Sequence, residues 1–339
     1  MKPVAKYCAR GLGYSLIVVF LYSAIALSLL VYSIVVFKYG VALKNRLLNN
    51  YQKEFYFSGY RNIWQAIEEC IELDDKLIYK PRLGVCHFNN PEFSTTLNFG
   101  PYGRISHLQD ELKGSGIAVL GDSFAMGWGV EDDETFAAVL ERKIKRPVYN
   151  LAVSSYGTYR ELLRLEKSGL VDSVDTVIIQ YCSNDLNENL DFKNERLETV
   201  YKQFKSARSL TGSGHTYKFV LNMSLYALIE PIRLLKNILL EKEEPLLDFA
   251  PHYDAFIKVI NEFAWLKNKN VIVIYVNGPP ETRFKEFPGR SNANTLPKYL
   301  KFLDIKLSSD YFFVVDGHLT KYGHEKMAGE LFDSIYQNH

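Results

Sequence analysis

Residues 118–124 read Ala-Val-Leu-Gly-Asp-Ser-Phe, an apolar run that stops at a Gly-Asp-Ser triplet. The apolar residues predict a buried β-strand, and the triplet places one serine, Ser123, where that strand ends. A hydroxyl nucleophile has to be held still and kept accessible, and the end of a strand backed by a packed core meets both needs. Taken alone the triplet is weak evidence, because average composition produces it by chance in roughly one chain in ten of this length. Residues elsewhere in the chain have to decide whether Ser123 is a nucleophile.

From about residue 114 onward, short apolar runs alternate with helical patterns. The runs are rich in β-branched residues and bounded by turn residues; the predicted strands are 117–120, 148–151, 176–182, 271–276 and 311–315. Apolar residues at helical spacing lie between or after them, around residues 136–140, 162–165, 256–263 and 327–335. Strands that alternate with helices indicate parallel crossovers and a sheet covered on both faces. The sequence therefore predicts an α/β domain over residues 114–339.

Polar residues follow the predicted strands at the ends where ligands collect in parallel sheets. The strand-end residues are Gly121-Asp122-Ser123 after the first strand, Asn150 and then Gly157 after the second, Ser183-Asn184-Asp185 after the third, and Asp316-Gly317-His318 after the last. A nucleophile, candidate oxyanion donors, a carboxylate and an imidazole are therefore expected to meet on one rim of the sheet.

This ordered set resembles the SGNH/GDSL hydrolase family, whose name records Ser, Gly, Asn and His in successive blocks. The matching residues are Ser123, Gly157, Asn184 and His318, although Phe124 stands where the family more often has Leu. The order of four blocks is far more specific than any single block. The resemblance covers about residues 114–339 and implies a three-layer α/β/α, flavodoxin-like fold with a parallel sheet.

The resemblance also implies an esterase with a Ser-His-Asp triad. Ser123 would attack an ester carbonyl after His318 takes its proton, and Asp316 would orient the imidazole. The family usually ends in Asp-x-x-His, whereas here only Gly317 separates the two residues. Residues two apart in extended backbone point the same way, and glycine gives the turn freedom, so we expect the carboxylate to reach the ring.

The same resemblance implies an oxyanion hole made of the backbone N–H groups of Ser123 and Gly157 and the side-chain amide of Asn184. A serine mechanism supplies its own nucleophile, and no histidine cluster has ligand spacing, so we expect neither a cofactor nor a metal. Two neighbouring residues receive other roles: Asp122 is expected to bond nearby backbone, and His324 is expected at the surface of the last helix.

An uncharged apolar stretch lies near the amino terminus. Residues 11–37 hold 27 consecutive residues without a formal charge, which is long enough to span a bilayer. A cleaved signal peptide has a shorter apolar region followed by a small-x-small site, whereas this stretch runs directly into Lys38. We therefore expect one uncleaved transmembrane helix; the alternative is a buried core helix of unusual length.

The basic residues that flank this stretch hardly favour either orientation in the membrane, because three lie on each side of it within residues 1–46. A ten-residue tail without acids is easily retained inside. We therefore place residues 1–10 in the cytoplasm and the catalytic domain outside the cell membrane, in the periplasm if the cell is Gram-negative.

Two further segments depart from the α/β alternation. Residues 38–113 mix short apolar runs with turns, which predicts a lead-in subdomain of helices and short strands. Residues 186–248 are first polar and then apolar, which predicts a helical insertion. Charges such as Lys218 and Glu230 argue against a second membrane span. We favour a helical cap over the site; a helix lying on the membrane surface is the alternative.

Charge and cysteine content restrict the partners. Beyond residue 46 the chain carries 34 basic and 39 acidic side chains, so no nucleic-acid partner is expected. The four cysteines lack the Cys-x-x-Cys spacing of metal sites. Cys70 and Cys86 either pair in an oxidising compartment or remain two free thiols, and Cys182 lies in an apolar pattern that predicts a buried thiol.

Three functions fit these observations. The leading hypothesis is a membrane-anchored serine esterase that removes an acyl group, with acetyl favoured, from a cell-envelope carbohydrate or lipid. An O-acyltransferase would form the same acyl-serine but pass the acyl group to a hydroxyl of a cell-surface polysaccharide. A noncatalytic envelope-assembly or carbohydrate-binding protein would keep the fold with an idle site, and it predicts a broken catalytic set.

Overall fold

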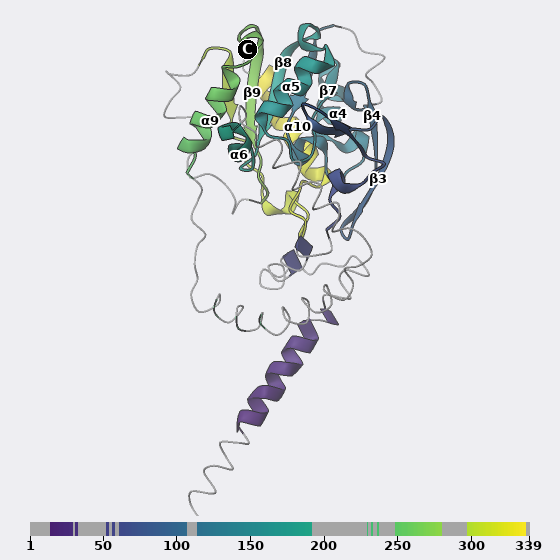
Figure 1. The fold of residues 1–339 in the computed structure, drawn as a ribbon, viewed down its shortest axis with the longest axis vertical. Helices are drawn as coiled ribbons and strands as arrows, with labels where there is room; N and C mark the ends of the chain where they lie inside the picture. Colours follow the sequence, from purple (N-terminus) through teal and green to yellow (C-terminus); the bar gives the residue numbers. More distant parts are fainter. Residues whose placement is uncertain are drawn as a thin grey trace, which may run out of the picture. The chain divides into compact units, whose positions relative to one another are not determined.

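The computed structural model describes residues 14–29, 31–32, 52–53, 56–57, 61–106, 114–191, 229, 232, 236, 248–279 and 297–336. The chain divides into two units, one of residues 1–61 and 211–244 and the other of residues 62–210 and 245–339. The second unit contains Ser123 and the strands of the central sheet (Figure 1).

One sheet of eight strands runs through the second unit. Its strands are β3 (Gly84–Asn90), β4 (Phe93–Gly100), β5 (Gly103–Arg104), β6 (Gly116–Leu120), β7 (Val148–Asn150), β8 (Val174–Tyr181), β9 (Asn270–Tyr275) and β10 (Leu300–Leu303). Their order across the sheet is β10-β9-β8-β6-β7-β5-β4-β3. The pairs from β10 to β7 are parallel, and the pairs from β7 to β3 are antiparallel. The predicted α/β class with a mostly parallel sheet is confirmed.

Helices cover both faces of the parallel part (Figure 1). The helices of the second unit are α3 (Ser123–Met126), α4 (Phe136–Ile144), α5 (Thr158–Ser168), α6 (Asp185–Asp191), α9 (Ala250–Ile260) and α10 (Lys321–Tyr336). Successive side chains of β6 enter different cores, because a strand alternates its faces. Ile117 packs in a core with residues of α4 and α10, and Ala118 in a core with residues of α5 and α9. The arrangement is a three-layer α/β/α sandwich.

Four of the five predicted strands are present as β6, β7, β8 and β9, but the predicted strand 311–315 is wrong. Ser309–Tyr311 forms a 3-10 turn, and Phe312 makes an isolated bridge to Leu319. The fifth parallel strand is β10, which pairs with β9. Its four residues include the exposed Lys301, so its apolar pattern is too short and interrupted to stand out in the sequence.

The segment before β6 belongs to the same sheet. Strands β3 to β5 join it through the pairing of Arg104 with Asn150, so this part of the expected lead-in subdomain 38–113 is an extension of the α/β domain. A separate hairpin precedes them, formed by β1 (Ile71–Asp74) and β2 (Ile78–Pro81). A disulfide joins Cys70 to Cys86, which selects pairing over two free thiols. Cys182 is a buried free cysteine, as predicted.

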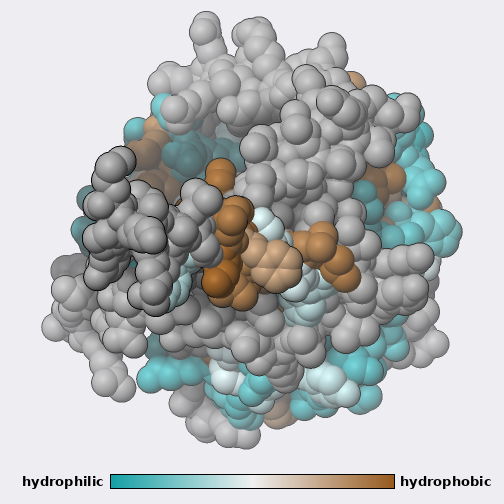
Figure 2. Space-filling view, turned by 90° about the horizontal axis from the view of Figure 1, so that it is seen from below, coloured by the Kyte–Doolittle hydropathy of each residue, from teal (hydrophilic) through white to brown (hydrophobic). Residues whose placement is uncertain are grey.

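In the first unit, residues 14–29 are helical. Apolar side chains of this helix, such as Leu16 and Phe20, are largely exposed. Figure 2 shows exposed hydrophobic residues in brown near the middle of the view. Among the described residues, none of the helices combines the length and the apolar character that crossing a membrane requires. The expected transmembrane helix at residues 11–37 is therefore not confirmed. The expected tail of residues 1–10 and most of the insertion at 186–248 lie outside the described residues.

Candidate active site

Ser123 lies in the sharp turn that connects β6 to α3. Gly121 has a φ of 149°, and a Cβ placed there would lie 2.6 Å from Oε1 of Gln180 and 2.7 Å from Cβ of Ala125. Asp122 is the N-cap of α3, and its side chain accepts a hydrogen bond of 2.9 Å from the Phe124 N–H. The turn therefore needs glycine at 121 and a short acceptor at 122, which explains the triplet before the chemistry is considered.

Gln180 holds this turn from β8. Its buried side chain accepts hydrogen bonds of 3.2 Å from the N–H groups of Asp122 and Ala125. Its amide nitrogen donates to the Val276 carbonyl at 3.1 Å. One buried amide thus satisfies backbone groups on both sides of β8 and fixes the place of Ser123.

A continuous chain of hydrogen bonds joins the three predicted triad residues. The Ser123 hydroxyl lies 2.7 Å from Nε2 of His318, and Nδ1 of His318 is hydrogen-bonded to Oδ1 of Asp316. With a neutral imidazole, the hydroxyl donates to Nε2 and Nδ1–H donates to the carboxylate. Gly317, at a φ of 81°, lets the backbone turn back within one residue. The short Asp-Gly-His spacing is therefore compatible with a Ser–His–Asp arrangement.

Trp128 completes the surroundings of the imidazole, and the sequence analysis did not select it. Its Nε1–H donates to Oδ2 of Asp316 at 3.2 Å, the carboxylate oxygen that His318 does not use. Its rings stack on the His318 ring with centroids 4.9 Å apart, and the Phe124 ring lies 4.5 Å from the same imidazole. The triad side chains are buried or nearly so, with Ser123 9% exposed. The feature of the sequence that could have drawn attention to Trp128 is its position between Gly127 and Gly129.

A buried ion pair fixes the loop that carries Trp128. Arg104, from β5, donates to Asp132 at 2.6 Å and to the carbonyl groups of Met126, Gly127 and Val130 at 2.9, 2.7 and 2.5 Å. Both charged side chains are buried, and the guanidinium uses its fork of donors on three backbone carbonyl groups of the loop as well as on the carboxylate. The segment before β6 therefore supports the site from outside the predicted blocks.

The predicted oxyanion donors differ in their availability. Nδ2 of Asn184 donates to Oδ2 of Asp122 at 3.2 Å, which joins the third block to the turn that carries Ser123. The Gly157 N–H donates to Oε2 of Glu188 at 3.1 Å. A backbone amide has one hydrogen, so Gly157 can serve an oxyanion only if Glu188 moves away. Glu188 is itself held by the buried guanidinium of Arg160, at 2.6 and 2.8 Å.

Two fully buried carboxyl groups lie behind this part of the site. Asp185 begins α6 and accepts from the Cys182 N–H at 3.2 Å, whereas neither side-chain oxygen of Glu161 has a hydrogen-bond partner in the described structure. Burial, followed by the charge of Asp185, raises the pKa of Glu161 well above its usual range. Burial and the nearby Asp122 likewise raise the pKa of Asp185. These groups favour their neutral forms.

His324 is buried, so its predicted surface position is wrong. Its ring stacks on Phe136, and its Nδ1 accepts the Phe136 N–H at the start of α4 at 3.1 Å. Burial lowers its pKa to about 3. The imidazole is therefore a neutral cap of α4 packed between two helices, and not a second base.

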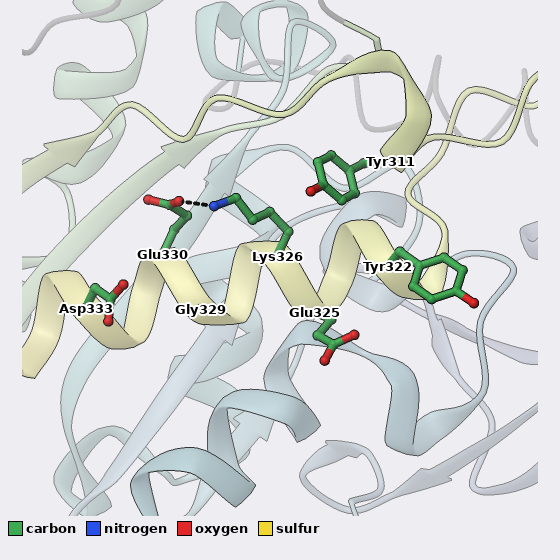
Figure 3. A pocket seen from close by; sticks show the side chains of 7 residues that line it. All are labelled: Tyr311, Tyr322, Glu325, Lys326, Gly329, Glu330 and Asp333. Atoms are coloured by element: carbon green, nitrogen blue, oxygen red, sulfur yellow. Dashed lines mark hydrogen bonds and ion pairs between the residues drawn. The ribbon is translucent and has the colours of Figure 1, made fainter.

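A shallow groove along α10 lies apart from the triad. It is lined by Tyr311, Tyr322, Glu325, Lys326, Gly329, Glu330 and Asp333 (Figure 3). Lys326 points toward Glu330 and pairs with it at 2.6 Å. Because none of these residues belongs to the hydrogen-bonded chain at Ser123, this groove is not the candidate active site.

Over the described ranges, no group of three or more His, Cys, Asp or Glu side chains is arranged to hold a metal ion.

Comparison with known proteins places these features in context. The model of the GDSL-like lipase/acylhydrolase family matches residues 117–331. Similar solved structures include a lipase/acylhydrolase from Enterococcus faecalis, with 16% identity over 66% of this chain and 96% of that chain and a TM-score of 0.35. A carbohydrate esterase family 2 enzyme with a carbohydrate-binding domain, from Corynascus thermopiles, shows 12% identity over 69% of each chain and a TM-score of 0.36. A GDSL-like lipase from Bacteroides thetaiotaomicron shows 13% identity over 66% of this chain and 89% of that chain, with a TM-score of 0.30. No curated protein matches the chain.

Proposed function

The chain belongs to the GDSL-like lipase/acylhydrolase family, and from this premise we propose that Ser123 is the nucleophile with which this ester hydrolase removes an acyl group from its substrate. The observation that carries the proposal is the hydrogen-bonded chain from Ser123 through His318 to Asp316. Each group has the partner that its role requires, since the hydroxyl meets a base and the base meets an orienting carboxylate.

The proposed reaction uses these three groups in turn. His318 takes the Ser123 proton at Nε2 as the oxygen attacks the ester carbonyl, and Asp316 stabilises the imidazolium through Nδ1–H. The tetrahedral intermediate collapses, and the leaving alcohol takes the proton back from His318. Water then attacks the acyl-serine while His318 removes its proton. The second tetrahedral intermediate collapses, the Ser123 oxygen takes that proton from His318, and the carboxylic acid product leaves.

The charge that develops on the carbonyl oxygen needs hydrogen-bond donors. We assign this role to the Ser123 N–H and to Asn184, whose amide has two hydrogens and so can donate one to Asp122 and one to the oxyanion. Gly157 joins them only in a state in which Glu188 has released its N–H. A single donor of this kind contributes about 3 kcal/mol to transition-state stabilisation.

We further propose that the enzyme acts outside the cytoplasm on an envelope ester, anchored by residues 11–37. Three observations support this: the 27-residue uncharged stretch, the exposure of apolar side chains on the helix of residues 14–29, and the Cys70–Cys86 disulfide, which persists in oxidising compartments. Ser123 is only 9% exposed beside Phe124, which favours a short acyl group such as acetyl. A reporter fused after His339 that is active only outside the cytoplasm tests the location; activity of a cytoplasmic reporter would refute it.

The nucleophile is tested on the full chain in detergent micelles. We expect wild type to hydrolyse p-nitrophenyl acetate and to be labelled by a serine-reactive fluorophosphonate, and Ser123→Ala to lose both properties. Ser94→Ala is the matched control, because the exposed Ser94 hydroxyl donates to Oδ1 of Asn89 in the β3–β4 pair, away from His318. Equal labelling of wild type and Ser123→Ala would reject the assignment.

A further inference from the structure

The loop that carries Asp316 and His318 has no strand to hold it. Residues 311–315 make no sheet ladder, so the backbone N–H groups of this loop need other acceptors. The carboxylate of one side chain accepts hydrogen bonds from three of these N–H groups. The carboxylate of Glu92 accepts hydrogen bonds from Val314 at 2.9 Å, from Val315 at 2.9 Å and from Asp316 at 2.6 Å.

Glu92 comes from a firmly held turn. It lies between β3 and β4, whose ladder pairs seven residues and closes with Asn90 opposite Phe93. The neighbouring Phe93 ring packs on Phe313, with centroids 5.4 Å apart, and on Phe88 at 5.3 Å. Phe88 in turn packs edge-on against Trp128 at 4.5 Å. The turn therefore meets the triad loop through both a carboxylate and a line of aromatic rings.

We propose that Glu92 is a positioning residue that sets the place of Asp316, and through it of His318, in the proposed reaction. A carboxylate that accepts three N–H groups fixes three successive peptide planes at once, and such charge-assisted bonds are the strong ones. This explains why one glycine suffices between Asp316 and His318, since the loop is clamped from outside. The inference rests on the proposed function, because a positioned base matters only if Ser123 is the nucleophile.

Two opposing effects act on the charge of Glu92. Burial raises the pKa of Glu92, while its bonds from the loop N–H groups oppose that shift and favour the anion.

The test uses Glu92→Gln in the full chain in detergent micelles, with p-nitrophenyl acetate as the probe. We expect kcat to fall roughly ten- to hundredfold, as for the loss of a charge-assisted bond, with KM nearly unchanged. Glu69→Gln is the matched control, since its carboxylate accepts one backbone N–H, from His87 in β3, away from the triad.

The outcomes separate cleanly. A kcat equal to that of Glu69→Gln, or a loss that appears in KM and not in kcat, would overturn the role of Glu92 while fluorophosphonate labelling of wild type still upheld the nucleophile. Absence of labelling in wild type would instead reject the proposed function and the inference with it. If Glu92→Gln does not fold, Glu92→Ala is assayed with added formate: recovery of activity supports the positioning role, and no recovery overturns it.

Discussion

The two halves of the proposed triad are held in different ways. The turn that bears Ser123 is built locally, because a buried strand delivers it, Gly121 opens it and Asp122 caps the helix that follows. The loop that bears His318 has no strand, and its geometry depends on Glu92 and Trp128, which lie far away in the sequence. The comparison teaches that the proposed nucleophile is positioned by one short motif, whereas the proposed base needs support from several segments.

The largest effect should come from breaking the second half at Asp316. Asp316→Asn keeps the shape of the side chain but removes the charge and can favour the wrong imidazole tautomer. We expect kcat for p-nitrophenyl acetate to fall by about 10³- to 10⁴-fold with the fold intact. Steady-state kinetics and circular dichroism measure both properties. A loss of less than about tenfold would show that Asp316 does not orient His318.

The next effect should come from the first half, at Gly121. Gly121→Ala places a Cβ 2.6 Å from Gln180 and forces a strained backbone, so we expect a loss of about 2–4 kcal/mol in the free energy of unfolding. Gly169→Ala is the control: its φ of 74° is also left-handed, but a Cβ there meets nothing within 4 Å, so it should cost only about 1 kcal/mol. Chemical denaturation of both variants decides, and equal losses would contradict the crowding argument.

A smaller effect is expected from Trp128→Phe. This variant tests whether the loop that bears His318 depends on the hydrogen bond from Trp128 Nε1–H to Asp316. Phenylalanine keeps an aromatic ring beside His318 but cannot donate to Asp316, so kcat should fall about tenfold. In Trp64→Phe the same exchange removes an Nε1 that has no acceptor among the described residues, and its kcat should stay near wild type. Equal rates for the two variants would show that the Trp128 bond has no catalytic weight.

The smallest effect concerns how the free energy of unfolding depends on pH through the buried carboxyl group of Glu161. The raised pKa of Glu161 means that the folded chain keeps a proton that the unfolded chain releases above about pH 4. Stability is therefore complete below that pH and is lost as pH rises through the raised pKa. Glu161→Gln should abolish this loss and exceed wild type at pH 8 by on the order of 1 kcal/mol.

Thermal unfolding between pH 5 and 9 checks this prediction, with Glu166→Gln on the exposed side of α5 as control. A difference between Glu161→Gln and wild type that stays constant with pH would show that Glu161 does not titrate in this way.

The predictions from sequence succeeded where the signal was local and failed where it was not. β6 and α5 were predicted because buried parallel strands and amphipathic helices leave periodic patterns. The run 311–315 has the composition of a strand, but its N–H groups bond to Glu92 and to the His318 carbonyl, and composition cannot show this. The family resemblance implied Gly157 as an oxyanion donor, yet its amide donates to Glu188.

The sequence by itself determined the order of chemistry along the chain: a strand that ends at Ser123, an amide at Asn184, and a carboxylate and an imidazole separated by Gly317. These features are local, because apolar periodicity and turn residues act over a few positions. Only the tertiary structure decided what supports them, namely Gln180 beneath the serine and Trp128 and Glu92 around the base. Such contacts join residues far apart in the chain, and they exist only once hydrophobic burial has brought the segments together.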